Sequence, residues 1–359
     1  MNHFLRDIEE ARSNGAPVVL YGFAKLGRRL LAFLNSMSVD VSVIAVDRAF
    51  APIVPSYLGI PVVIIDELVE SGNAYNYIVA FNPRNRREHI RERLLPSARL
   101  ILLYDFGYGV CEDVYSATAC YAGYASCYRQ HIDEVFGWLE DARSRETLRA
   151  FIEQKQTGLF GIYSQFFTPH QYFPDDVIRL KDGCDFLDCG AYNGDTITAF
   201  LDKLNRDGIA GYSSIYAFEP AADAFRQLQT MSASLDNCRI MQKGVWDEEC
   251  TLHFHQNGRE SIFMEEGALQ VETVTIDAVL EGRPASFIKM DVEGAELRAL
   301  HGAAATIRNH RPALAVCIYH KPEDLLTIPR FIKKLHPDYK LYIRGHSTLA
   351  TNELVLYAV

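Results

Sequence analysis

The chain has 359 residues, with 36 Lys and Arg against 46 Asp and Glu and a formal net charge of −10. At about 150 residues per domain, this length predicts two domains. The acidic balance argues against a nucleic-acid-binding protein, and no apolar run reaches the roughly 18 residues of a membrane helix. Eight cysteines without a C-x-x-C pair, and an N-terminus that does not resemble a signal peptide, favour a cytoplasmic protein with reduced thiols.

Residues 1–104 alternate short apolar strands with helices, which predicts a small Rossmann-like α/β domain. The loop Gly22-Phe-Ala-Lys-Leu-Gly27 follows the first strand, and Asp47 ends the second strand, 20 residues after Gly27. An acid at this place binds ribose in dinucleotide folds. Two interpretations stay open, a nucleotide or nucleotide-sugar site and a structural module without a ligand. Alanine in the middle of the loop favours the structural module, because its methyl group occupies the space that a pyrophosphate needs.

Residues 105–170 are rich in aromatic side chains and poor in short apolar strands. Helical spacing of apolar residues predicts a helix over residues 134–156. We interpret this segment as a helical connector whose aromatic residues serve packing.

A second α/β pattern begins at about residue 171 and continues to residue 359. Its predicted strands cover residues 184–189, 214–218, 237–245, 286–290, 313–319, 340–344 and 353–359. The loop between the last two strands is too short for a crossover helix, so we expect them to pair antiparallel.

The segment Phe186-Leu-Asp-Cys-Gly-Ala-Tyr-Asn-Gly-Asp-Thr196 is the strongest sequence signal. Asp188 ends a strand, where it can organise the glycine loop and accept a hydrogen bond from a ligand ammonium group. The following helix N-terminus offers free N–H groups to a carboxylate, such as the methionine end of S-adenosylmethionine. Glu219 ends the next strand, and its two oxygens match two ribose hydroxyls. The loop lacks the G-x-G-x-x-G pattern, which favours a sulfonium nucleoside over a pyrophosphate.

Five segments together resemble the FkbM family of S-adenosylmethionine-dependent methyltransferases, over about residues 171–359. They are FLDCGAYNGDT, YAFEPAADAF, VETVTIDAVL, FIKMDVEGAELRALHGA and the tail CIYHKPEDLLTIPRFIKKLHPDYKLYIRGHS. The resemblance implies a class I methyltransferase fold, an α/β Rossmann-like sheet of seven strands in the order 3-2-1-4-5-7-6. It also implies O-methylation as the reaction class, and some FkbM-like proteins carry a similar leading Rossmann-like module.

Carried over to this sequence, the resemblance implies a set of cofactor contacts. Tyr172 is expected to cover the methionine end, Val245 and Trp246 to lie near the adenine, and Ser261 to belong to a segment that folds over the site. The full expected set is Tyr172, Asp188, Gly190, Asn193, Gly194, Asp195, Thr196, Glu219, Val245, Trp246 and Ser261.

Polar residues follow three further strands, at the sheet edge where ligands of α/β folds bind. The predicted general base is His320 or Asp291, and His346 is a third catalytic candidate. Lys321 and Arg344 are expected to hold an anionic group of the substrate. Blander interpretations stay open, with Asp291 as a helix cap and His346 as a plain loop residue. A metal held by Asp291, His320 and His346 is the weaker hypothesis, and none is expected.

The sequence therefore predicts a methyltransferase that uses S-adenosylmethionine to methylate a hydroxyl of a sugar, a glycan precursor or a small polar metabolite. The main alternative is an NAD(P)-dependent oxidoreductase, or a nucleotide-sugar-binding module, that uses the loop at Gly22–Gly27 with Asp47. A non-enzymatic module with a vestigial cofactor site is less consistent with the intact residues Asp188, Gly190, Gly194 and Glu219. We expect neither a nucleic-acid nor a membrane partner, and a homo-oligomer stays open.

Overall fold

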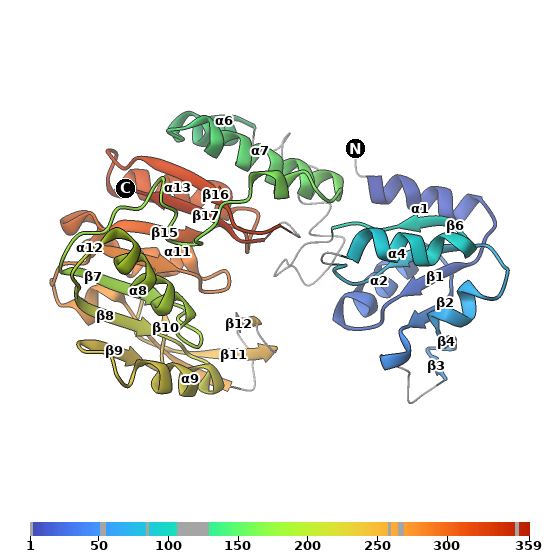
Figure 1. The fold of residues 1–359 in the computed structure, drawn as a ribbon, viewed down its shortest axis with the longest axis horizontal. Helices are drawn as coiled ribbons and strands as arrows, with labels where there is room; N and C mark the ends of the chain where they lie inside the picture. The colour runs from blue at the N-terminus through green and yellow to red at the C-terminus, as the bar shows by residue number, and fades with distance from the viewer. Residues whose placement is uncertain are drawn as a thin grey trace. The chain divides into compact units, whose positions relative to one another are not determined.

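The computed structural model describes residues 3–50, 55–83, 86–105, 129–257, 260–264, 269–348 and 352–359. The chain divides into two compact units, each with its own sheet (Figure 1). Unit 1 comprises Met1–Cys127, Arg149–Gln165 and Thr348–Thr351, and unit 2 comprises Tyr128–Leu148, Phe166–Ser347 and Asn352–Val359. Residues of the predicted connector fall in both units.

Unit 1 is built on a six-stranded sheet in the order β3-β4-β2-β1-β5-β6, parallel except for β3. Alternate residues of β1 belong to two different apolar clusters: Val18 and Leu20 to one, Val19 and Tyr21 to the other. A strand with side chains on both faces of a covered sheet reads as continuously apolar, as this segment does. The strands are β1 (Val18–Tyr21), β2 (Val41–Val46), β3 (Ser56–Tyr57), β4 (Ile60–Ile64), β5 (Tyr75–Val79) and β6 (Ala98–Leu102). The helices are α1 (His3–Ser13), α2 (Lys25–Ser36), α3 (Ile65–Val69) and α4 (Arg87–Leu94), with short 3-10 turns η1 (Arg48–Phe50), η3 (Leu95–Ser97) and η4 (Tyr163–Phe166).

The single helix predicted over residues 134–156 is two helices, α6 (Arg129–Trp138) and α7 (Ala142–Thr157). The chain breaks between them because Leu139 bridges to Leu341 of the sheet in unit 2. Asp141 then begins α7 by accepting a hydrogen bond from the Ser144 N–H at 2.7 Å, as an N-terminal cap does.

Unit 2 is built on a seven-stranded sheet in the order β16-β17-β15-β14-β7-β8-β9. Numbered along the chain from the other edge, these strands follow the order 3-2-1-4-5-7-6, and β17 is antiparallel to both of its neighbours. The strands are β7 (Cys184–Cys189), β8 (Tyr212–Phe218), β9 (Cys238–Met241), β14 (Phe287–Met290), β15 (Ala313–Cys317), β16 (Leu341–Gly345) and β17 (Leu354–Ala358). The helices are α8 (Asp195–Asp207), α9 (Ala222–Ser232), α10 (Ile276–Leu280), α11 (Glu296–His301), α12 (Ala304–His310) and α13 (Asp324–Leu335).

A second, four-stranded sheet in unit 2 was not predicted from the sequence. Its order is β10-β13-β11-β12, with β10 (Gly244–Val245), β11 (Thr251–Asn257), β12 (Glu260–Met264) and β13 (Leu269–Val274). In the part of the chain that the structure describes, no helix has the length and apolar character needed to cross a bilayer.

Candidate active site

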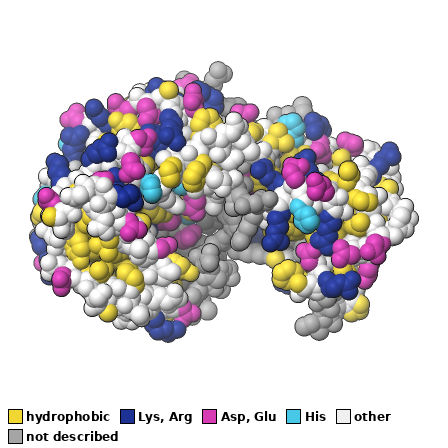
Figure 2. Space-filling model, viewed as in Figure 1, with side chains coloured by type: hydrophobic (Ala, Val, Ile, Leu, Met, Phe, Trp, Pro, Cys, Tyr) yellow, Lys and Arg dark blue, Asp and Glu magenta, His cyan; other side chains and the backbone are white. Residues whose placement is uncertain are grey.

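A cavity of about 540 Å³ opens at the carboxyl ends of the parallel strands of the seven-stranded sheet. Its volume lies within the roughly 300–1,000 Å³ of small-molecule sites. Figure 2 shows acidic side chains inside a recess on the visible face of this unit. The residues that line the cavity are Gln171, Tyr172, Gly190, Tyr192, Asp195, Thr196, Phe218, Glu219, Pro220, Ala221, Asp223, Ala224, Gln227, Lys243, Gly244, Val245, Lys289, Asp291, Val292, Glu293, Tyr319 and Glu353.

The glycine loop after β7 forms one wall of the cavity. Gly190 has a φ of +84°, and a Cβ built on it would lie 1.8 Å from the Asp291 carbonyl oxygen, so only glycine fits. Gly194, also at positive φ, leads into α8, and Asn193 Oδ1 accepts a hydrogen bond from the Asp195 N–H at 3.3 Å. Asp195 and Thr196 line the cavity at the N-terminus of α8, where unpaired N–H groups favour an anion.

Asp188 lies beneath this loop and does not line the cavity. Its side chain is fully buried, with Oδ1 3.0 Å from Lys289 Nζ. Lys289 also donates a hydrogen bond to the Gly190 carbonyl at 2.6 Å. Burial lowers the pKa of Lys289, but the attraction of Asp188 and Asp291 outweighs it and raises the pKa, so the ammonium group stays charged. The prediction that Asp188 contacts a ligand ammonium is therefore corrected, because a lysine of the neighbouring strand already occupies that place.

Glu219 follows the last residue of β8, at the strand end where it was predicted, and lines the cavity. Its Oε2 accepts a hydrogen bond from the Tyr192 N–H at 2.9 Å, and its Oε1 accepts one from the Ala221 N–H at 2.8 Å. Burial raises the pKa of Glu219, although both amides favour the ionised form. Each oxygen keeps a further lone pair for a ligand.

Of the two residues predicted to contact adenine, Val245 and Trp246, one lines the cavity and the other does not. Val245 lines the cavity together with Phe218 and Ala224. Trp246 does not line it, and the Arg298 guanidinium lies 5.7 Å from its ring centre. Ser261 falls in β12, where the structure describes the backbone but not the side chain.

The other half of the cavity carries three carboxylates, those of Asp291, Glu293 and Glu353. The Tyr172 hydroxyl donates a hydrogen bond to Asp291 Oδ2 at 2.7 Å. Burial raises the pKa of Asp291, but Lys289 and His320 outweigh it and lower the pKa, so this carboxyl is ionised.

Glu353 was missed by sequence reasoning. It directly precedes β17, and because β17 is antiparallel, its first residues lie at the edge where β14 and β15 end. Gln171 Nε2 donates a hydrogen bond to its carboxylate. Burial and the nearby Asp291 charge raise the pKa of Glu353 to about 7. The predicted antiparallel pairing of the last two strands was the signal that could have placed this residue at the site.

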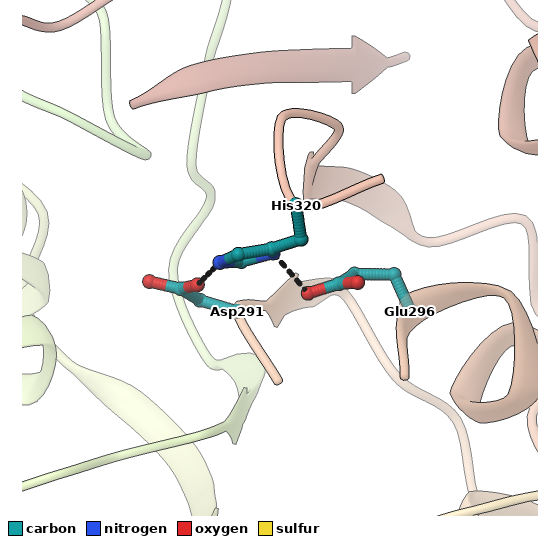
Figure 3. A group of neighbouring side chains, drawn as sticks. All are labelled: Asp291, Glu296 and His320. Carbon is teal, nitrogen blue, oxygen red and sulfur yellow. Dashed lines mark ion pairs between the residues drawn. The ribbon is translucent and has the colours of Figure 1, made fainter. Parts of the chain in front are cut away.

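His320 follows β15 but lies behind the cavity wall, with 3% of its surface exposed. Figure 3 shows its ring between Asp291 and Glu296, with one nitrogen toward each. Nδ1 lies 2.9 Å from Glu296, and Nε2 lies 3.6 Å from Asp291 and 3.3 Å from Glu293. Burial lowers the pKa of His320, but these carboxylates raise it well above its usual value. A protonated imidazole cannot accept a proton, so the predicted role of His320 as general base is corrected to that of a buried cation.

Ligand atoms of Asp291, Glu296 and His320 lie within 4.8 Å of one another, close enough to consider a metal ion. The two carboxylates, however, face different ring nitrogens (Figure 3). One ion could bind only one of these nitrogens. The arrangement therefore fits an imidazolium between two carboxylates, and the metal hypothesis with His346 is not supported.

Arg344 and His346 are corrected from site residues to structural ones. Arg344 is buried, and its Nη2 lies 2.6 Å from Asp141 and 2.8 Å from Asp176. His346 Nδ1 contacts the Thr168 carbonyl oxygen at 2.7 Å, and Nε2 contacts the Tyr357 hydroxyl at 2.8 Å. These structural roles follow from position, because Arg344 lies on β16 and His346 directly follows it. β16 is the edge strand and is separated from β14 by two strands.

Lys321 also does not line the cavity. Its backbone N–H donates a hydrogen bond to Asp324 Oδ2 at 3.2 Å, at the start of α13. The structure therefore places neither predicted anion-binding side chain at the cavity.

Four residues other than glycine have positive φ angles and line this one cavity: Tyr172 (69°), Tyr192 (45°), Glu293 (53°) and Glu353 (53°). Such conformations cost of order 1–3 kcal/mol each and gather at functional sites. They come from four separate loops, which supports the cavity as the functional site of unit 2.

In unit 1, the first glycine loop is accounted for by its own packing. A Cβ on Gly27 would lie 2.2 Å from the Gly22 carbonyl oxygen. Asp47 Oδ1 lies 2.6 Å from Arg93 Nη1 and accepts a hydrogen bond from the Tyr21 hydroxyl at 2.8 Å. Both features exist without a ligand, so nucleotide binding at this loop stays a prediction.

The sheet order and the cavity at its carboxyl edge define unit 2 as a class I methyltransferase-like α/β fold. Residues 188–341 match the family model of the methyltransferase FkbM domain. The resemblance to the FkbM family seen in the sequence is therefore confirmed over residues 188–341.

The crystal structure of methyltransferase FkbM from Methylobacillus flagellatus KT is similar over 100% of this chain and 94% of its own, with a TM-score of 0.77 and 19% identity. This likeness shows that both units share its fold. Fibrillarin of Aeropyrum pernix with bound S-adenosyl-L-methionine (TM-score 0.34, 16% identity, 51% of this chain and 70% of that one) is a distant match. An rRNA methylase of Streptococcus thermophilus is a second distant match, with a TM-score of 0.33 and 13% identity over 50% of this chain and 87% of that one. No curated protein matches the chain.

Proposed function

We propose that this protein transfers a methyl group from S-adenosylmethionine to a hydroxyl of a sugar or another small polar acceptor, with Glu353 as general base. The observation that carries the proposal is that one cavity joins a nucleoside-type half, with Glu219, to an acidic half, with Glu353. The FkbM domain supplies the reaction class.

The residues of the nucleoside half fit the cofactor. Phe218, Ala224 and Val245 offer an apolar surface for adenine, and Glu219 offers two acceptors to the ribose hydroxyls. The N–H groups at the start of α8 suit the methionine carboxylate. Lys289 on β14 also lines the cavity, and it donates a hydrogen bond to the Gly190 carbonyl of the glycine loop.

When bound, S-adenosylmethionine would supply a methyl group on a sulfonium, with the neutral thioether S-adenosylhomocysteine as the leaving group. The chain has to align the acceptor and take up its proton, and alignment alone can remove much of the barrier. Glu353 suits the proton transfer, because a base with a pKa of about 7 is half ionised at neutral pH. Gln171 fixes the orientation of this carboxylate, and the ionised Asp291 accepts a hydrogen bond from the acceptor.

Calorimetric titration with S-adenosylhomocysteine and, separately, with NADH tests the cofactor. We expect binding of the first and none of the second, and the reverse result would favour an oxidoreductase. Incubation with S-adenosylmethionine labelled in the methyl group and a panel of sugars, followed by intact-mass analysis, tests the transfer. Fragmentation of the product that places the label on an amine or a carbon would contradict O-methylation.

A further inference from the structure

The order of the strands separates the cavity into two halves. β8 and β9 lie on one side of β7, while β14, β15 and β17 lie on the other. The second group of strands carries the acceptor half, which is lined by Asp291, Glu293, Glu353, Tyr172 and Tyr319. Its only cationic lining residue among the described side chains, Lys289, is paired with Asp188.

The acceptor half has an excess of negative charge after its internal ion pairs are counted. Asp291, Glu293, Glu296 and Glu353 face it or lie directly behind it, and His320 is the cation among them. Asp291 Oδ1 is buried and has no hydrogen-bond partner. Repulsion among these groups is consistent with the raised pKa values of Glu293 and Glu353, for which burial is the larger cause.

Carboxylates that line a cavity favour a bound cation and disfavour an anion, because the attraction acts in a region of reduced dielectric. The side chains that sequence reasoning assigned to a substrate phosphate or carboxylate, Lys321 and Arg344, lie elsewhere. Among the described residues, the two cationic side chains that line the cavity, Lys243 and Lys289, are paired with Glu272 and Asp188. These residues therefore offer an anionic substrate neither an arginine fork nor an unpaired lysine.

We propose that the acceptor substrate carries a positively charged amine beside its reacting hydroxyl, as in an amino sugar, and that Glu293 with Asp291 binds this amine. The inference rests on the proposed function, since it concerns the acceptor of the same reaction. Glu293 is the principal contact, because its side chain is one-third exposed and lines the cavity, whereas Asp291 is already held by Tyr172. The ring of Tyr319 in the same half offers a face to the ammonium group.

The test uses the full chain saturated with S-adenosylhomocysteine. The ammonium group of this cofactor product is then already bound when the sugars are added. Glucosamine, glucose and glucose 6-phosphate differ in charge on the same ring, and their dissociation constants are measured by calorimetry in metal-free buffer. We expect glucosamine to bind at least tenfold more tightly than glucose, and glucose 6-phosphate more weakly than glucose. The preference should shrink when NaCl rises from about 50 to 500 mM, because exposed parts of the ion pair are screened.

Glu293→Gln should reduce the preference for glucosamine over glucose to less than threefold and leave the affinity for S-adenosylhomocysteine unchanged. The matched control is Glu281→Gln, whose side chain is 79% exposed and lies outside the cavity. If Glu293→Gln does not fold, the proposal is tested instead with Glu293→Asp and with the NaCl dependence of the glucosamine preference in the wild type.

Equal binding of the three sugars, no binding of any of them, or tightest binding of glucose 6-phosphate would overturn the proposal. Binding of glucose that appears only after Mg²⁺ is added would overturn it in favour of a metal-held acceptor. In each case, intact binding of S-adenosylhomocysteine would leave the proposed function standing. Loss of cofactor binding in the wild type would instead refute the proposed function itself.

Discussion

Asp188 and Lys289 form an ion pair between neighbouring strands, in register across β7 and β14. Oδ1 and Nζ lie 3.0 Å apart, and the two side chains are 0% and 2% exposed. Because Lys289 also holds the Gly190 carbonyl oxygen, the pair connects the centre of the sheet to the glycine loop. The loop that receives the cofactor in our proposal is therefore positioned by a charge pair that lies beneath it.

Replacing Lys289 with Met should destabilise the protein by about 3–5 kcal/mol, because an uncompensated buried carboxylate remains. Urea unfolding measures this loss, and S-adenosylhomocysteine should bind more weakly because the Gly190 contact is gone. The double variant Asp188→Asn/Lys289→Met should recover part of the stability but not the affinity. Lys334→Met, at an exposed position of α13, is the control. Wild-type urea resistance in Lys289→Met would show that the pair does not stabilise the fold.

Glu219→Gln should weaken the binding of S-adenosylhomocysteine by tenfold or more. Both carboxylate oxygens accept backbone N–H groups, so the amide nitrogen of glutamine must face either the Tyr192 or the Ala221 N–H, and donor meets donor. Calorimetry gives the change in affinity, with Glu281→Gln as the matched exposed control. An unchanged dissociation constant would remove Glu219 from the ribose site.

Glu353→Gln should lower the rate of methyl transfer by about 10²-fold or more while leaving cofactor affinity intact. The wild-type rate should rise with pH and level off above about 7, because the carboxylate form of Glu353 accepts the proton. The variant should lose this inflection. A profile that keeps the inflection in Glu353→Gln would assign the base to another group.

Ionisation of the Glu353 carboxyl should raise the rate of methyl transfer but lower the stability of the folded chain. The pKa of Glu353 is about 7 in the folded chain against an ordinary 4.5, so between these values the folded state binds more protons than the unfolded one. Its contribution to stability therefore falls as pH rises through this window. Thermal unfolding at pH 8 should show Glu353→Gln more stable than wild type. If the difference in melting temperature between Glu353→Gln and the wild type were the same at pH 5 and at pH 8, the assigned pKa would be contradicted.

His346 should behave as a structural residue. Burial lowers its pKa to about 4, so as pH falls from about 6.5 to 4 the unfolded state takes up a proton first and the folded state loses stability. His346→Gln should lower stability at pH 7 by roughly 1–3 kcal/mol, through two broken hydrogen bonds, and flatten this acid dependence. Cofactor affinity should stay as in the wild type. His301→Gln, at an exposed position, is the control. If His346→Gln kept the wild-type stability but lost most of the activity, His346 would have to be assigned to the active site again.

Local patterns predicted the parts of the site that follow parallel strands near the centre of the sheet. Gly190, Glu219 and Asp291 each lie at the end of such a strand, and all three line the cavity. The same reasoning failed for His346, because a residue after β16 lies at the sheet edge, which depends on strand order. Lys289 was missed because a lysine in an apolar strand is informative only once its cross-strand partner is known.

The sequence by itself determined that two α/β patterns occur, which loop must be glycine-rich, and that the second pattern resembles the FkbM family. These features depend on side-chain periodicity and on backbone conformations that few residue types allow. Tertiary structure decided which charges meet. It paired Asp188 with Lys289, placed His320 between carboxylates, and brought Glu353 to the cavity. The free energy of a buried charge depends on partners that are distant along the chain, and sequence spacing does not contain that information.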